Sequence, residues 1–162
     1  MMGKRAFTQE ASGRLNKLIT KCGICEAYTP SPDSKHPKII QFDALWDTGA
    51  TVSAISDNVV KALGLSSFSM CQVFHAKGVS DTSKYKINML LPNGVAFSKM
   101  TVLEGDLQGC DVLIGMDIIS LGDFAVTNRD GKTLFSFQIP STHYYDFVKQ
   151  IENEKTQNKK KK

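Results

Sequence analysis

An acidic residue stands at the end of an apolar run in residues 45–51, which read Leu-Trp-Asp-Thr-Gly-Ala-Thr. Aspartate is rarely buried in a protein unless it is paired or takes part in chemistry. Asp47 follows two large apolar residues, and Gly49 comes two positions later, so an apolar strand must end here in a tight turn that carries a carboxylate. The fold of this chain therefore has to place Asp47 where a strand leaves the core.

The length and hydropathy of the chain limit the classes of protein to which it can belong. Its 162 residues suit one domain with a substantial core. No apolar run approaches the roughly 20 residues that span a bilayer, and residues 1–14 lack the apolar centre of a secretory signal. The sequence therefore predicts a cytoplasmic protein that does not associate with membranes.

The net charge of +4 comes entirely from the last four residues, which are all lysines. Without residues 159–162, basic and acidic residues are equal in number. The remaining lysines are scattered among acids and are not interleaved with aromatic residues, as a nucleic-acid platform would require. We therefore expect no nucleic-acid partner, and we interpret residues 146–162 as a charged, disordered tail.

Two of the four cysteines, Cys22 and Cys25, have the C-x-x-C spacing of half a zinc site or of a redox pair. A structural zinc site needs four ligands, and no second C-x-x-C or suitable histidine pair is present. The surrounding residues are apolar and strand-like. Buried, reduced thiols are the favoured interpretation, with a redox pair and a metal site as alternatives, and we expect neither metal nor cofactor.

The first half of the chain has two apolar, strand-like runs, residues 18–28 and 38–47, separated by a proline-containing polar loop. Residues 51–56 predict a further short strand after the turn at Asp47. A short helix is expected over residues 56–65, because Ser56 or Asp57 can cap its beginning and Gly64 can end it.

The second half of the chain is dominated by strand patterns. Residues 71–92 predict a long hairpin around a polar, glycine-containing middle, and Asn93-Gly94 is a strong turn signal before another strand. The short apolar run of residues 111–115 predicts a strand buried on both faces, followed by one or two helical turns. Residues 133–140 alternate as a last strand. The sequence thus predicts a mostly β protein, a small closed barrel with one or two short helices.

Residues 44–56 and 111–119 together resemble the active-site segment and the hydrophobic-hydrophobic-glycine segment of retropepsin-like aspartic proteases. Residues 73–81 lie between them, where that family has its flap hairpin. The resemblance extends over roughly residues 20–140, and it is closest in pattern to the single-domain members of bacteria and retroelements. It implies a small acid-protease barrel over residues 20–145, preceded by an N-terminal arm at residues 1–19.

The resemblance also assigns roles to the residues of the turn. Asp47 is the expected acid and base, Gly49 permits two backbones to approach each other, and Thr48 braces the loop by hydrogen bonds to a partner's loop. Ala50 is small enough to pack beneath the site and to line it. Residues at the tip of the flap are expected to contact a peptide substrate: Ala76, Lys77, Gly78 and Val79.

The chain contains one Asp-Thr-Gly and no second Asp-Ser/Thr-Gly. Peptide hydrolysis in this family uses two carboxyl groups that share one proton, so the resemblance implies a homodimer with one Asp47 from each chain. The expected function is that of an aspartic endopeptidase acting on a peptide or polyprotein. The alternative is a catalytically silent retropepsin-like module for dimerisation or peptide binding. Asp111 and Asp117, near the second segment, are interpreted as caps or turn residues.

Overall fold

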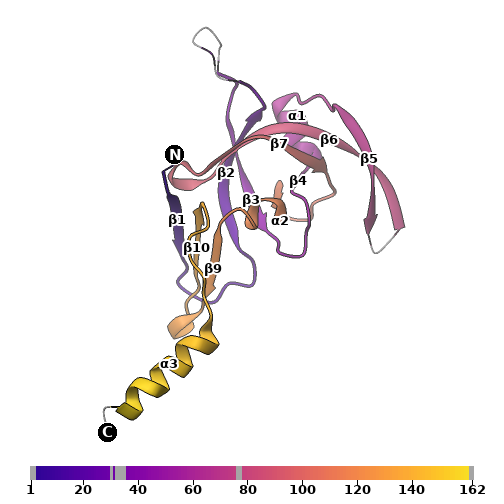
Figure 1. The fold of residues 1–162 in the computed structure, drawn as a ribbon. Coiled ribbons are helices and arrows are strands. Elements are labelled where there is room, and N and C mark those ends of the chain that lie inside the picture. Colours follow the sequence, from indigo (N-terminus) through magenta and orange to yellow (C-terminus); the bar gives the residue numbers. More distant parts are fainter. Residues whose placement is uncertain (1–2, 30, 32–35, 76–77, 161–162) are drawn as a thin grey trace.

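The computed structural model describes residues 3–29, 31, 36–75 and 78–160. Over these residues the chain is mostly β, as the sequence predicts, with a few short helices (Figure 1). Ten strands are described, and they form two sheets that share one core. A helix at the C-terminal end projects away from both sheets.

The larger sheet contains the strands that carry the Asp47 turn. Its order in the described residues is β2-β3-β8-β4-β7-β6-β5, and β2 also pairs with β6, so the pairings return to the strand from which they began. The strands and their bounds are β2 (Ile19–Glu26), β3 (Ile40–Trp46), β4 (Ala54–Ile55), β5 (Ser69–His75), β6 (Gly78–Leu90), β7 (Ala96–Glu104) and β8 (Val112–Ile114).

The smaller sheet joins the two ends of the domain. Strand β10 (Leu134–Ile139) pairs antiparallel with β1 (Arg5–Glu10) on one side and with β9 (Asp123–Thr127) on the other. Neither β1 nor β9 was predicted from the sequence. Residues 1–19, interpreted as an arm, therefore contribute a paired strand, and Phe7 of that strand is buried in the core.

The short helices follow the capping signals of the sequence. Helix α1 (Asp57–Leu63) begins after Ser56 and ends at Gly64, which adopts the left-handed conformation with φ 63°. Helix α2 (Met116–Ile119) is a single turn after β8. Two short 3-10 segments, Pro92–Gly94 and Arg129–Gly131, form the turns before β7 and β10.

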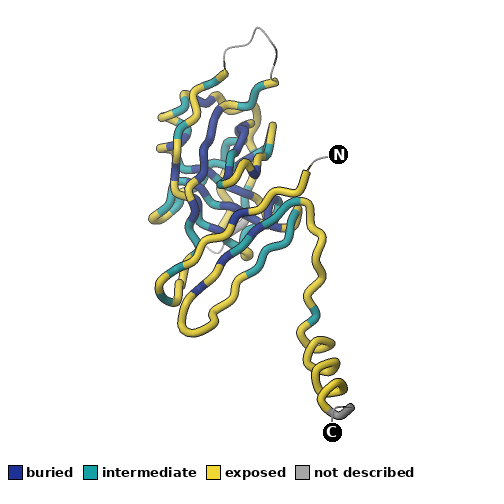
Figure 2. The backbone as a smooth tube through the Cα atoms, turned by 90° about the vertical axis from the view of Figure 1, so that its left-hand side faces the viewer, coloured by how far each residue is buried: buried dark blue, intermediate teal, exposed yellow. Residues whose placement is uncertain are grey.

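The C-terminal segment differs from the sequence interpretation. Residues interpreted as a disordered tail form helix α3 (Phe147–Lys160). This segment contains no glycine or proline and is rich in lysine, glutamate and glutamine, which favour helix. The described side chains of residues 147–158 are all exposed (Figure 2). Helix α3 therefore contributes nothing to the core of the domain.

The core is formed by the inner faces of both sheets. The alternation read from the sequence is confirmed on β6, where Tyr85, Ile87 and Met89 are buried, and on β10, where Phe135 and Phe137 are buried. Cys22 and Cys25 are also buried and are not joined in a disulfide. No residue of the described part of the chain belongs to a group of three or more metal-ligating side chains. No helix of that part is both long and apolar enough to cross a membrane.

Candidate functional site

Asp47 lies immediately after β3, and its backbone is fixed by two neighbouring segments. The amide of Trp46 donates a hydrogen bond to the carbonyl of Leu18 at 2.9 Å, and the amide of Asp47 donates to the carbonyl of Ile114 at 2.9 Å. Strands β3 and β8 run parallel, with Trp46 opposite Ile114. The carboxyl ends of the two strands therefore emerge side by side, with Asp47 next to Gly115.

The tryptophan before Asp47 anchors the end of β3 in the core. Its ring centroid lies 5.0 Å from that of Phe135 and 5.0 Å from that of Phe137, both on the smaller sheet. Its indole N–H donates to the buried hydroxyl of Thr20 at 2.9 Å. Buried tryptophan normally finds such a partner for its only polar atom. The aromatic cluster therefore fixes where β3 ends and where Asp47 begins.

The carboxylate of Asp47 is held by its own loop. The side-chain Oδ1 accepts a hydrogen bond from the amide of Gly49 at 2.8 Å. The backbone carbonyl of Asp47 accepts one from the amide of Ala50 at 3.2 Å. A Cβ atom on Gly49 would lie 3.1 Å from Oδ1, so the turn favours glycine at this position. Asp47 is half-buried, whereas Thr48 and Gly49 are exposed. The loop thus presents its acid and its hydroxyl at the surface of the domain.

A second set of hydrogen bonds braces the loop against the start of α2. The carbonyl of Ala50 accepts from the amide of Met116 at 2.8 Å. The buried hydroxyl of Ser53 accepts from the amide of Gly115 at 3.0 Å and donates to Asp117 Oδ1 at 2.7 Å. Asp117 was interpreted as a cap or turn residue, and Ser53 was not singled out. Their pairing spans 64 positions in the sequence, and no local pattern signals it.

Gly115 is the closest point between the two segments. A Cβ atom on it would lie 2.9 Å from the carbonyl oxygen of Ala50 and 2.9 Å from the carbonyl carbon of Val52. Backbone at this distance cannot accommodate a side chain without moving. The glycine of the hydrophobic-hydrophobic-glycine segment is therefore required by the approach of residues 47–53, the Asp47 loop.

The hairpin of β5 and β6 occupies the position expected for a flap. Phe74 pairs with Val79, and His75 pairs with Gly78, whose φ is 127°. Val79 is 53% exposed, so its side chain is available to a ligand. The other two residues expected to bind substrate, Ala76 and Lys77, lie outside the described residues. In Figure 1 the hairpin extends away from the body of the domain.

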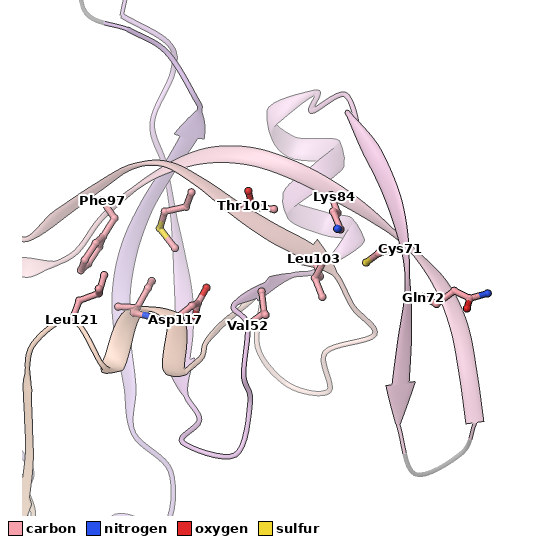
Figure 3. Close-up of a pocket in the computed structure, with 11 residues that line it drawn as sticks. Val52, Cys71, Gln72, Lys84, Phe97, Thr101, Leu103, Asp117 and Leu121 are labelled. Carbon is pink, nitrogen blue, oxygen red and sulfur yellow. Dashed lines mark hydrogen bonds between the residues drawn. The ribbon is translucent and has the colours of Figure 1, made fainter.

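Two cavities adjoin the Asp47 loop from different sides. One, of about 420 Å³, lies against β9 and includes Asp47 and Thr48 in its wall. The other, of about 620 Å³, lies between strands β5, β6 and β7 and helix α2 (Figure 3). Its lining includes Val52 from the Asp47 loop and Cys71 from β5, but none of the predicted site residues. The structure thus groups Asp47, Thr48, Gly49 and Ala50 on one loop and places Gly78 and Val79 on a separate hairpin.

Comparisons with known proteins bear on the family and the fold of the chain. The sequence model of the family described as "gag-polyprotein putative aspartyl protease" matches residues 39–120. Among solved structures, a retropepsin-like aspartic protease from Rickettsia conorii superimposes with a TM-score of 0.50 at 10% identity, covering 85% of this chain and 97% of that one. The retroviral protease-like domain of Ddi1 from Leishmania major gives a TM-score of 0.44 at 17% identity, covering 75% and 95%. A search of curated proteins finds no match.

Proposed function

Because this chain belongs to the gag-polyprotein aspartyl protease family, we propose that it is an aspartic endopeptidase in which Asp47 activates water. One observation carries the proposal. Asp47 is fixed by the parallel pair β3–β8 at the surface of the protomer, yet its carboxylate forms no ion pair with any described residue. Its one described side-chain hydrogen bond, from Gly49, orients the acid and leaves Oδ2 open to a substrate or a second carboxyl group.

The second carboxyl group comes from a second copy of the chain. The sequence holds a single Asp-Thr-Gly, and a twofold axis beside it supplies the same loop again. Thr48 and Gly49 are exposed, and the Thr48 hydroxyl has no hydrogen-bond partner among the described residues. An exposed loop with a free hydroxyl suits close contact with its own symmetry mate. In this arrangement Thr48 braces the two loops across the axis.

The chemistry follows from two carboxyl groups about 3 Å apart, which hold one proton between them. The ionised Asp47 takes a proton from water, and the water oxygen forms a bond to the carbonyl carbon of the peptide. The protonated Asp47 of the other copy gives its proton to the carbonyl oxygen, which produces a neutral gem-diol. Breaking the C–N bond then returns one hydroxyl proton to a carboxylate, while the amine leaves with the other carboxyl's proton. The pair ends with one proton, as it began.

The β5–β6 hairpin is the proposed cover of the substrate. An extended peptide between it and the Asp47 loop would bind through main-chain hydrogen bonds, as an added strand. Gly78, Val79 and Ala50 are the described residues proposed to contact it, together with Ala76 and Lys77. A peptide-like inhibitor should slow the amide hydrogen exchange of β5 and β6. Unchanged exchange on inhibitor binding would contradict a role for the hairpin as a flap.

Asp47→Asn tests the proposal, because it keeps the shape of the side chain and removes the base. We expect the rate of cleavage of a peptide library to fall at least about a hundredfold. The variant should remain folded and dimeric by sedimentation, because two neutral amides of the same shape replace the carboxyl pair and place no charge between the two copies. Wild-type cleavage should be favoured at acidic pH and decline once the shared proton is lost. EDTA should leave the rate unchanged, since the carboxyl pair alone activates the water.

Three outcomes would contradict the proposed function or favour its alternative. Equal rates for wild type and Asp47→Asn would remove Asp47 from the mechanism, and an active monomer would refute the shared site. Peptide binding without cleavage would favour the silent binding module. A cytoplasmic location and the lack of a metal, a cofactor or a nucleic-acid partner stay predictions from the sequence.

A further inference from the structure

The larger cavity beside the Asp47 loop has a mixed chemical character. Figure 3 shows apolar side chains, Phe97 and Leu121, at one end and Lys84 with Cys71 toward the other. Most of its wall is apolar, and its residues come from the flap strands, β7, the Asp47 loop and α2. The lining residues are Val52, Cys71, Gln72, Lys84, Phe97, Met100, Thr101, Leu103, Asp117, Ile118 and Leu121.

Lys84 is the cationic residue of that wall. On β6 it stands opposite Ser69 of β5 and opposite Leu103 of β7, and its neighbour Tyr85 is buried in the core. Because side chains alternate along a strand, Lys84 lies on the face of the sheet that turns away from the core and toward the cavity. It is half-buried, and its ammonium group forms no ion pair or hydrogen bond with any described residue.

Asp117, the acidic residue of the cavity wall, forms no ion pair with Lys84. Asp117 lines the same cavity, but its Oδ1 already accepts hydrogen bonds from the amide and hydroxyl of Ser53 and from the amide of Ile118. Lys86, two positions along β6, is exposed and donates to the hydroxyl of Thr101, which also lines the cavity. Lys86 does not itself line the cavity, so Lys84 is the cation in its wall. A partly desolvated ammonium without an acceptor favours a ligand that brings a carboxylate.

The cavity is within reach of a peptide bound at Asp47. Val52 is in its wall and lies five positions after Asp47, so the two residues are at most about 18 Å apart along the chain. An extended peptide advances about 3.3 Å per residue. A residue within about five positions of the cleaved bond can therefore place its side chain in this cavity. The apolar lining would contact the methylene groups of that side chain while Lys84 meets its end.

We propose that this cavity is a charge-selective subsite, in which Lys84 selects peptides that carry an acidic side chain at one position away from the cleaved bond. The inference rests on the proposed function for the location of the peptide. It adds a chemical class of substrate, an acidic peptide, and a residue that determines it. Asp117 keeps its charge in the same wall, but its Oδ1 is engaged by Ser53 and Ile118, so Lys84 is the group proposed to receive the acidic side chain.

The test uses a library of peptide pairs that differ only by Glu or Gln, with the difference moved through successive positions. For the full-length wild type we expect one position at which the Glu peptide has a kcat/KM about tenfold higher, the effect of one charge-assisted hydrogen bond. The ratio should fall as salt is added. Lys84→Met should bring it to about one by lowering the kcat/KM of the Glu peptide. Lys84→Glu should favour a Lys peptide at the same position.

Lys132→Met is the matched control, because Lys132 is exposed at the end of the Arg129–Gly131 turn and lines neither cavity. It should keep the wild-type ratio. A wild type without preference at any position, or a preference that survives in Lys84→Met, would overturn the proposal. The variants and the wild type should unfold at the same temperature. A lost preference for the Glu peptide then reflects recognition and not a loss of folding.

Binding of the same pairs to Asp47→Asn separates this inference from the proposed function. Suppose that the wild type cleaves no peptide, that the Glu peptide binds about tenfold more tightly than the Gln peptide, and that Lys84→Met removes this difference. The subsite would then stand, and the proposed catalysis would fail. If peptides are cleaved without a charge preference, catalysis stands and the subsite fails. If no peptide is bound or cleaved, both fail.

Discussion

Asp117 Oδ1 accepts two hydrogen bonds from Ser53, one from its amide at 3.0 Å and one from its hydroxyl at 2.7 Å. Ser53 is fully buried, and its hydroxyl also accepts from the amide of Gly115. The end of the Asp47 loop is thereby tied to the first turn of α2. A buried polar network of this kind is stabilising while every member has its partner. The geometry around Asp47 therefore depends on the buried Ser53 hydroxyl, which lines neither cavity.

Ser53→Ala should loosen this connection. The change leaves the Gly115 amide without its acceptor and Asp117 without one of its donors, which should cost about 1–3 kcal/mol of unfolding free energy. Activity should fall further than stability suggests, because small displacements of a catalytic group are costly. Urea unfolding and peptide cleavage measure the two effects. Ser66→Ala, in an exposed loop, is the control and should match the wild type, whereas a normal Ser53→Ala would mean that the network is dispensable.

Gly115→Ala should displace the Asp47 loop. Its Cβ would lie 2.9 Å from the carbonyl oxygen of Ala50, so strand β8 and the loop must separate. Overpacking of this kind typically destabilises a protein by about 1–3 kcal/mol, and we expect peptide cleavage to be lost. Gly13→Ala provides the comparison, because no atom lies within 4 Å of the added Cβ. Equal cleavage rates for the two variants would show that the close approach at Gly115 has no bearing on the site.

The C-x-x-C cysteines should be unreactive in the folded protein. Burial, with smaller contributions from Asp43 and Asp111, raises the pKa of Cys22 to about 12, and burial also raises the pKa of Cys25. Since the thiolate is the reactive form, iodoacetamide at about pH 8 should alkylate half-buried Cys71 first. Mass mapping of labelled peptides reads out the order, and all four cysteines should react in urea. Rapid labelling of Cys22 in the native state would revive the redox-pair interpretation.

The segment after β10 should be held to β9 in a pH-dependent way. Asp123 accepts hydrogen bonds from the Ser141 hydroxyl, from the amides of Thr142 and His143 and from the His143 ring. These bonds, led by that from Ser141, lower the pKa of Asp123 well below its usual range. The stabilisation is therefore complete above the unfolded value of about 3.9 and is lost as the pH falls through the lower folded value.

Hydrogen exchange of the Thr142 and His143 amides measures this contribution. Their protection in the wild type, relative to Asp123→Asn, should be greatest near neutral pH and decline progressively below about pH 4. Amides within β10 provide the internal control, because they pair with β1 and β9. If the wild type and Asp123→Asn show the same protection at every pH, the carboxylate does not hold the segment.

The sequence by itself determined the elements whose signals are local. Alternating apolar residues predicted β6 and β10, and Gly64 predicted the end of α1. The turn that carries Asp47 could be read from seven residues, because an apolar run, an acid and a glycine each constrain the same short piece of backbone. The resemblance of residues 44–56 and 111–119 to retropepsin-like aspartic proteases supplied the expected chemistry. Helix α3 was missed because its lysine-rich composition is compatible with both a helix and a disordered tail.

The tertiary structure alone decided the features that join distant parts of the chain. Strand β1 was not recognised because its pairing partner, β10, lies about 130 residues away, and only one of its residues is buried. The bond between Ser53 and Asp117 and the position of Lys84 in the wall of a cavity likewise depend on which strands become neighbours. Periodicity tells which face of a strand is apolar. It does not tell which segment covers that face, or which residues of neighbouring strands a polar side chain contacts. Those contacts form only when the sheets pack, and they fix the setting in which Asp47 is held.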